Sequence, residues 1–298
     1  MNIAINTTTA NFSSVAQGFA LNSWMSDIPI IDSLSLAQLV LPGAHNAGVD
    51  KKASYFAPGA SNWIACQNNS FYYQLNSGAR ALDLRLGYEI AGNGVGTFWF
   101  EHNGFRSSRS LENLITSVIR FLQENPDEFI VLDFHQLNAG NRPFDYKEFN
   151  RLLLTHLGDR IIPYTNTFLP LEELKRLSPA RRLLVAAEYH PQLDLTYFHR
   201  KIEHKWSGIS TTSISELNAY ITHVMKHPPS RALPWSLSAT SYQVATGPVN
   251  IGAYIDQWFD PELNDWATNS SIINTDFFET SNVVRHCLIA NLIQAYAK

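Results

Sequence analysis

The stretch ALDLRLG, residues 81–87, places two charged side chains inside an apolar run. Because Asp83 and Arg85 are two residues apart, a β-strand would put both on one face and Leu82 and Leu84 on the other. Such a polar face fits the interior of a barrel, where charges are tolerated if they are paired or form a site. The stretch therefore predicts a barrel strand whose two charges either serve a site or form an ion pair that holds the barrel together.

Apolar runs of the same kind recur along the chain and alternate with amphipathic segments. They predict buried parallel strands in LVLPG (39–43), TFWFEH (97–102), EFIVLDFH (128–135), RRLLVAAEY (181–189) and SIINTDF (271–277). Helices are predicted at 110–126, with Ser110 as the N-cap, and at 144–158, 171–178 and 213–227. Because the alternation continues without an interior linker or repeat, the sequence predicts an α/β fold, a single irregular TIM (β/α)8-like barrel spanning residues 1–298.

The composition narrows the classes of partner. The 298 residues are 45% hydrophobic, and 22 basic against 26 acidic side chains give a net charge of -4. No basic surplus supports binding to nucleic acid or electrostatic docking on an anionic membrane. Contact with lipid would have to use apolar and aromatic side chains instead. The chain is expected to be a monomer.

Cysteine content and hydropathy bear on the compartment. Cys66 and Cys287 are too few for a disulfide framework and lack the paired spacing of a zinc site, so two buried free thiols are favoured over one disulfide. No apolar run approaches the length that spans a bilayer, and residues 1–20 have neither a basic segment nor a sustained apolar core. We expect a secreted, soluble protein that contacts membranes transiently and whose signal sequence has already been removed.

Polar residues stand at the ends of several predicted strands. His45 follows a Pro-Gly turn, His102 precedes a Gly, Asp133 and His135 share one strand face, and Asp276 follows a short apolar run. The carboxyl ends of the strands form the active face of a TIM barrel, so these side chains would converge. Taken singly, a histidine is more often a surface or hydrogen-bonded core residue, and Asp133 is equally compatible with a turn cap.

Four segments in this order, PGAHNAG, GARALDLRLG, FWFEHNG and NPDEFIVLDFH, resemble the X region of phosphatidylinositol-specific phospholipase C. The resemblance covers roughly residues 24–137, INTDF fits the last barrel strand, and 140–270 match little. Residues 1–23 would be an amino-terminal extension. The family implies an irregular TIM barrel that cleaves the phosphodiester between diacylglycerol and inositol.

The resemblance also implies roles for individual residues. His45 would be the general base that deprotonates the inositol 2-hydroxyl, which attacks phosphorus to form a 1,2-cyclic phosphate. His102 would be the general acid that protonates the leaving diacylglycerol oxygen. Asp276 would orient the base imidazole, and Arg85 would stabilise charge on the non-bridging phosphate oxygens.

A calcium requirement is the point on which the sequence combines two patterns within the family. Metal-independent bacterial members usually carry Asp directly after the first histidine, whereas this chain has Asn46, the residue type of the calcium-dependent members. Asn46, Asp83 and Asp133 form a candidate set of oxygen ligands for Ca2+. Arg85 argues against a strongly bound cation nearby. The sequence favours a calcium-dependent hybrid.

Substrate contacts and the membrane-facing rim follow from the same resemblance. Candidate inositol-binding residues are Glu188, Arg182, Trp206 and Tyr242. The segment 51–67, where family members carry a short rim helix, contains Tyr55, Phe56 and Trp63. These aromatics, together with Trp258 and Phe259, would enter the lipid interface, with ordinary core packing as the alternative.

Two other functions stay open on the sequence. A barrel phosphodiesterase for glycerophosphodiesters or sphingolipids would show a His-Arg-Gly motif with a Glu-rich metal site, and FHRK at 198–201 has no such Gly. A barrel that binds inositol or lipid after losing catalysis would lack one of the two histidines, and both His45 and His102 are present. The pattern therefore favours phosphatidylinositol cleavage.

Overall fold

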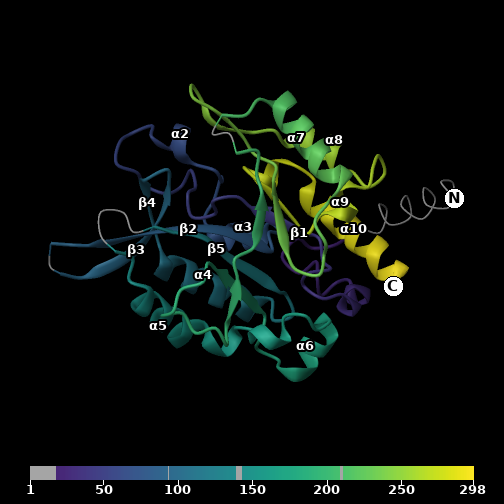
Figure 1. The fold of residues 1–298 in the computed structure, drawn as a ribbon, viewed down its shortest axis with the longest axis horizontal. Helices are drawn as coiled ribbons and strands as arrows, with labels where there is room; N and C mark the ends of the chain where they lie inside the picture. The colour runs from purple at the N-terminus through teal and green to yellow at the C-terminus, as the bar shows by residue number, and fades with distance from the viewer. Residues whose placement is uncertain (1–17, 93, 139–142, 209–210) are drawn as a thin grey trace.

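A parallel sheet of eight strands forms the centre of the molecule (Figure 1). The computed structural model describes residues 18–298 apart from 93, 139–142 and 209–210, so most of the expected amino-terminal extension lies outside the described residues. The strand order is β7-β6-β5-β2-β1-β12-β9-β8, and every neighbouring pair is parallel. The strands are β1 (Leu41–Ala44), β2 (Ala81–Ile90), β5 (Ile130–Asn138), β6 (Leu183–Ala187), β7 (Phe198–Arg200), β8 (Glu203–Lys205), β9 (Trp235–Ser238) and β12 (Ile272–Thr275).

The sheet curls into a barrel that stays open at one seam. β7 and β8 are consecutive in the chain, yet they stand at opposite ends of the strand order and do not pair with each other among the described residues. The fold is therefore an α/β half-barrel, a distorted form of the TIM-like barrel that the sequence predicts. The short strands β7, β8 and β9 were not predicted, because three or four residues carry too little hydrophobic periodicity.

An antiparallel ribbon extends from the long strand β2. β3 (Gly96–His102) pairs antiparallel with the outer half of β2, from Leu86↔Phe100 to Ile90↔Gly96, and with β4 (Phe105–Ser110). The prediction of a parallel barrel strand at 97–102 is therefore wrong. β2 has ten residues and projects beyond the barrel, which leaves an edge that β3 covers. A second small hairpin consists of β10 (Ser241–Gln243) and β11 (Gly247–Val249).

The predicted helices are all present. They are α4 (Leu111–Glu124), α5 (Tyr146–Leu157), α6 (Leu171–Leu177) and α7 (Ile214–Lys226). Ser110 caps α4 and exchanges hydrogen bonds with Asn113, which confirms it as the N-cap. The other helices are α2 (Ser61–Ile64), α3 (Phe71–Asn76), α8 (Gly252–Trp258), α9 (Trp266–Asn269) and α10 (Val283–Ala297), with 3-10 turns at Pro29–Ser33, Gly158–Arg160, Tyr164–Asn166 and Phe278–Thr280.

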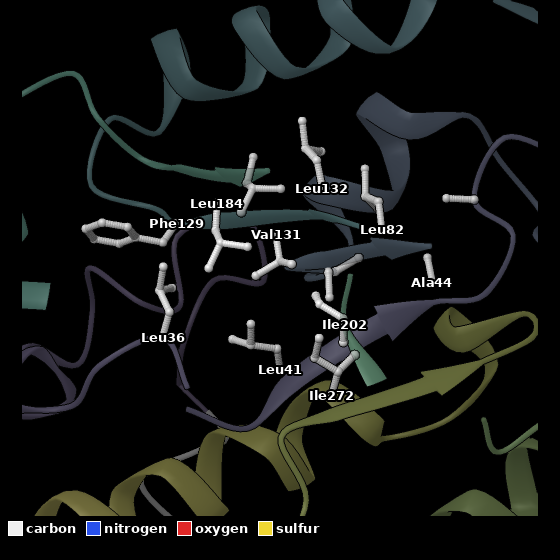
Figure 2. Packing of buried hydrophobic residues seen from close by; sticks show 14 of the residues in the cluster. Leu36, Leu41, Ala44, Leu82, Phe129, Val131, Leu132, Leu184, Ile202 and Ile272 are labelled. Atoms are coloured by element: carbon white, nitrogen blue, oxygen red, sulfur yellow. The ribbon is translucent and has the colours of Figure 1, made fainter. Parts of the chain in front are cut away.

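The core lies inside the half-barrel and between the sheet and its helices. Figure 2 shows buried side chains of β1, β2, β5, β6 and β12 in this core, Leu41, Leu82, Val131, Leu184 and Ile272 among them. In Figure 1, α4, α5 and α6 cover one side of the sheet, and α7 to α10 cover the other. Most buried apolar side chains belong to this one cluster, and a small second cluster contains Val49, Ala60 and Ile64. The single-domain organisation stays a prediction.

A buried ion pair closes the core at the amino-terminal end of β2. Arg80 Nη2 lies 2.6 Å from Glu128 Oε2, and both side chains are fully buried. The guanidinium also donates hydrogen bonds to the carbonyls of Leu75, Ala79 and Asn22. Each charge is therefore satisfied by protein groups, as a stable buried pair requires.

Two predictions about individual side chains are settled by burial. Trp258 and Phe259 pack in the core, so the prediction that they enter a lipid interface is wrong. Cys66 and Cys287 are both buried free thiols, as favoured. Of the described helices, none combines the length and the apolar character needed to cross a bilayer.

Candidate active site

A left-handed turn follows each of the three residues predicted to move or hold a proton. His45 directly follows β1, His102 ends β3, and Asp276 directly follows β12. The next residues are Asn46, Asn103 and Phe277, with φ angles of 43°, 52° and 48°, and they are the non-glycine residues with positive φ in the described part of the chain. Asn tolerates this conformation better than most residues. Backbone geometry therefore accounts for Asn46 without a metal.

His45 and Asp276 form a buried hydrogen-bonded pair. His45 Nδ1 lies 2.7 Å from Asp276 Oδ1, and because the carboxylate accepts, Nδ1 carries the proton. On the other side of the ring, Arg85 Nη2 donates to Nε2 at 2.8 Å. The imidazole is thereby fixed as the neutral tautomer with a lone pair on Nε2, which is the form that a general base requires.

Arg85 is held by Asp83, its neighbour on the same face of β2. The guanidinium donates to the two carboxylate oxygens at 2.9 and 3.2 Å, which confirms the predicted strand face. Asn274 donates to Oδ2 at 3.2 Å. Although burial alone would raise it, the charge of Arg85 with nearby imidazoles holds the pKa of Asp83 well below its usual range. Asp83 is thus ionised and positions a cation at the mouth of the barrel.

His102 faces His45 from the ribbon, with 6.4 Å between the ring centroids. Its Nδ1 lies 2.8 Å from the carbonyl oxygen of Ile64, which can only accept, so Nδ1 carries a proton. Cys66 Sγ lies 3.7 Å from the same nitrogen. Burial lowers the pKa of His102 to about 4, although the Ile64 carbonyl opposes the shift. The second ring nitrogen is therefore the one available for exchanging a proton with a ligand.

The predicted groups surround one cavity of about 670 Å3, a volume that suits a small polar ligand. Its lining includes His45, Arg85, His102 and Asp276, together with Trp206 and Tyr242, so the structure brings these predicted residues together. Sequence reasoning missed several others: Asn103, Gln136, Lys201, Glu203, Ser238 and Thr240. Most of them belong to short strands and connections, whose composition gives no signal of a site.

Two predicted substrate contacts lie outside the cavity. Arg182 precedes β6 at its amino-terminal end and donates to the carbonyls of Pro126, Ser178 and Arg181, so its role is structural. The Glu188 side chain is 77% exposed and lies 3.4 Å from Lys201. We therefore correct the prediction that these residues bind inositol. Arg182 lies at the opposite end of its strand from the cavity, and the Glu188 side chain points into solvent.

The predicted calcium ligands do not fit a calcium site. Both oxygens of Asp83 accept hydrogen bonds from Arg85, which places a positive charge beside them. Oδ2 of Asp133 lies 2.6 Å from His204 Nε2, so this oxygen already has a partner. Oδ1 of Asp133 and Oδ1 of Asn46 are the two oxygens of the set without a partner among the described residues. Ca2+ takes about six to eight oxygen ligands, and these residues offer too few of them.

A second histidine-carboxylate group contributes to the cavity wall. Besides the contact of His204 with Asp133, the rings of His204 and His135 stack at 3.6 Å between centroids with 16° between their planes. His135 and His204 both line the cavity. The sequence placed Asp133 and His135 on one face but gave no sign of His204, which belongs to the three-residue strand β8.

Exposed aromatic side chains stand near the mouth of the cavity. Phe56 is 71% exposed and stacks on the half-exposed Phe105, three residues after His102. Trp63, on the predicted rim helix α2, is 49% exposed and contacts the β10–β11 hairpin through a hydrogen bond to the Ala245 carbonyl. Tyr55 is half-buried and donates to the Asp50 carbonyl, so it contributes less to the rim.

Known proteins resemble the chain in sequence and in fold. It is 31% identical over 191 residues to the variant-surface-glycoprotein phospholipase C of Trypanosoma cruzi, covering 55% of this chain and 49% of that protein. It is 27% identical over 184 residues to the 1-phosphatidylinositol phosphodiesterase of Listeria monocytogenes, covering 60% and 52%. The aligned part thus spans about half the length of these curated relatives. No protein-family profile matches the chain.

Solved structures match nearly the whole chain. The phosphatidylinositol-specific phospholipase C of Listeria monocytogenes superimposes with a TM-score of 0.69 at 18% identity, covering 92% of this chain and 99% of that one. The enzyme of the same description from Staphylococcus aureus gives a TM-score of 0.62 at 13% identity, covering 91% and 97%. The fold therefore agrees with the sequence similarity, and in both the chain resembles the phosphatidylinositol-specific phospholipases C of the X-domain family.

Proposed function

We propose that the chain cleaves phosphatidylinositol by acid-base catalysis and releases diacylglycerol and an inositol phosphate. The observation that carries the proposal is the pair of imidazoles, His45 and His102, which line one cavity and face each other there, with the Arg85 guanidinium bonded to His45 Nε2. A barrel that only bound its ligand would have no need of an imidazole held in the basic tautomer by a buried carboxylate.

The first step uses His45 and Arg85 together. An incoming phosphate draws the guanidinium from His45 Nε2, because a charged oxygen is a stronger acceptor than a neutral nitrogen. The freed lone pair takes the proton of the inositol 2-hydroxyl. The hydroxyl oxygen bonds to phosphorus, the bond from phosphorus to the diacylglycerol oxygen breaks, and Arg85 stabilises the charge that accumulates on the non-bridging oxygens.

The second proton comes from His102. Its low pKa in the free protein means that a bound anion must favour the protonated form, and a phosphodiester carries that negative charge. His102 then protonates the leaving diacylglycerol oxygen, and the product is inositol 1,2-cyclic phosphate. If water opens this ring, the two imidazoles exchange roles, with His102 as the base and His45 as the acid.

The chemistry proposed here uses no calcium. Asp83 holds Arg85 at the position where a metal would have to balance the phosphate, so the guanidinium takes the electrophilic role. Phosphorus NMR of a phosphatidylinositol digest, with and without excess chelator, tests both points. We expect the cyclic phosphate signal to appear at equal rates in the two samples. Loss of turnover with chelator and its return with Ca2+ would show instead that the reaction requires calcium. Absence of any new phosphorus signal in both samples would contradict the proposed function.

The exposed aromatics are proposed to hold the chain at a lipid surface. Phe56 and Trp63 are exposed and close to residues of the cavity: the Trp63 carbonyl accepts from Tyr242, and Phe56 stacks on Phe105, three residues after His102. Such side chains would face the headgroups at a lipid surface. The double variant Phe56→Ser, Trp63→Ser should bind phosphatidylinositol-containing vesicles about tenfold more weakly. Tyr296→Ser removes an exposed aromatic at the far end of α10 and is the matched control. Equal vesicle affinity in all three proteins would contradict this orientation.

A further inference from the structure

Three side chains on one wall of the cavity are arranged as metal ligands. Asp133, His135 and His204 each place a ligand atom within 4.8 Å of the other two. We infer that they form a site for a divalent transition-metal ion of the Zn2+ type. The inference concerns binding alone and does not rest on the proposed catalytic activity.

Two atoms of this group are buried without a partner among the described residues. One is Oδ1 of Asp133, whose side chain is almost fully buried, and the other is Nδ1 of His135. Leaving such a group unsatisfied costs about 1–3 kcal/mol. The buried His102 shows the usual solution, a hydrogen bond from the ring to a carbonyl. A carboxylate oxygen and an imidazole nitrogen that both lack a hydrogen-bond partner, beside a third ligand, point to a cation.

The donor set decides which cation. Two imidazole nitrogens and one carboxylate oxygen suit Zn2+ and other late first-row ions, whereas Ca2+ and Mg2+ prefer oxygen alone. Nδ1 of His135 has no hydrogen-bond partner among the described residues, so this nitrogen is open to a ligand bond. An ion would replace the proton now shared between His204 and Asp133.

The side chains must rearrange to hold an ion. Ligand atoms around tetrahedral Zn2+ lie about 3.3 Å apart, given bonds of about 2.0–2.1 Å. The His204 Nε2 to Asp133 Oδ2 distance of 2.6 Å must therefore widen, and the stacked rings of His135 and His204 must tilt until their lone pairs converge. Arg85 and Lys201 oppose a cation here, while the ionised Asp83 favours one.

A second group in the same cavity offers a competing site. His45, Cys66 and Asp276 also lie within ligand distance of one another. There, however, His45 Nδ1 is already bonded to Asp276, and Arg85 occupies the opposite nitrogen. Burial raises the pKa of the Cys66 thiol well above its ordinary value, so the thiolate that a metal needs is disfavoured. The two groups can be told apart because only one contains sulfur.

Titration of the full chain with Zn2+ and with Co2+ tests the inference. After treatment with chelator and its removal, calorimetry should show one Zn2+ per chain, and Co2+ should give visible d–d absorption without a thiolate charge-transfer band. His204→Phe preserves a ring to stack on His135 but removes the ligand nitrogen. Asp133→Asn keeps the hydrogen bond to His204 but removes the charge. Each should weaken Zn2+ binding at least about tenfold.

Cys66→Ser and the exposed His223→Ala are the matched controls and should bind as the wild type does. Melting curves of every variant show whether it is folded. If His204→Phe does not fold, Asp133→Asn alone tests whether these side chains bind the ion. Absence of heat and of a Co2+ spectrum in the wild-type chain would overturn the inference. Unchanged binding in both ligand variants, or loss of binding in Cys66→Ser, would also overturn it by placing the metal elsewhere.

Discussion

Two arginines five positions apart, one directly before β2 and one in its middle, form the same kind of ion pair in opposite settings. At the amino-terminal end, Arg80 and Glu128 are fully buried, and the guanidinium is surrounded by carbonyls and aromatic rings. In the middle of β2, the side chain of Arg85 is 19% exposed and donates one hydrogen bond to an imidazole that lines a cavity. Burial lowers the pKa of Arg80, whereas Asp83 raises that of Arg85 against the effect of burial.

The difference shows how a buried charge can be assigned to structure or to function. Arg80 has protein partners on every side, so no donor remains for a ligand. Arg85 is held firmly by Asp83 from behind but meets His45 through a bond that a stronger acceptor can replace. Saturation of the donors, rather than burial or charge, separates the two roles.

The largest loss of turnover should follow from removing either of the two imidazoles that line the cavity. His45→Ala and His102→Ala are each expected to lower turnover by about two to four orders of magnitude, the usual loss for a general acid or base. Both variants should remain folded, since neither side chain belongs to the apolar core. Near-normal turnover in either variant would remove that residue from the mechanism.

Replacing each of the two arginines by alanine tests the comparison between them directly. Arg85→Ala should lower turnover by about 10²–10³, because it removes charge stabilisation from the transition state. It should also cost some stability, because the buried Asp83 carboxylate loses its partner, although Asn274 still donates to it. Arg80→Ala should cost about 3–5 kcal/mol of stability by leaving Glu128 unpaired, with normal turnover per folded molecule.

Urea unfolding and turnover normalised to folded protein separate these outcomes. If Arg80→Ala does not fold, Arg80→Lys keeps a charge at the same position and should show a smaller loss of the same kind. The functional assignment of Arg85 would fail if its alanine variant lost stability and kept its turnover.

Asp276→Asn should have an intermediate effect. The amide can still bond to His45 Nδ1, but it no longer stabilises the protonated ring or fixes its tautomer, so kcat should fall by about one to two orders of magnitude. KM should hardly change, since Asp276 acts through His45. Loss of substrate binding or of folding in this variant would indicate a structural role instead.

Acid should also act mainly through the residues around the cavity, because His102 makes the free energy of unfolding depend on pH. Because the pKa of His102 is about 4 in the folded chain and its ordinary value is 6.5, the unfolded chain binds the proton more tightly. The free energy of unfolding should therefore fall as the pH drops from about 6.5 to 4, by at most roughly 3 kcal/mol from this residue. His102→Gln can keep the bond to the Ile64 carbonyl and should flatten that part of the profile; an unchanged slope would contradict the pKa shift.

The sequence predicts the long elements and the residues beside them well. β2, β5 and α4 have enough length for their periodicity to be read, and the two-residue spacing of Asp83 and Arg85 correctly places both on one face. His45, His102 and Asp276 are each marked by a strand end and a turn. For these parts, local chemistry and tertiary structure agree.

The remaining features depend on contacts that local sequence does not encode. β3 has the composition of a buried strand, yet it joins the sheet antiparallel because β2 projects beyond the barrel. Asn46 suggests a metal ligand until its left-handed backbone is known. His204 and Lys201 reach the cavity from β8 and the two-residue connection before it, and Arg182 has the right residue type at the wrong end of its strand.

The pairing of β1 with β12 has a consequence for the order of folding. It joins Leu41 to Ile272 and Ala44 to Thr275, and the Asn291 amide clamps both backbone groups of Val40 from α10. His45 and Asp276 meet only through this pairing, across 231 positions of chain. Contacts of such sequence separation form slowly, because a long loop must close before they stabilise anything. A refolding chain should thus regain its helices and the β2–β5–β6 half of the barrel as an inactive intermediate, and its catalytic base should become functional only in the slowest phase.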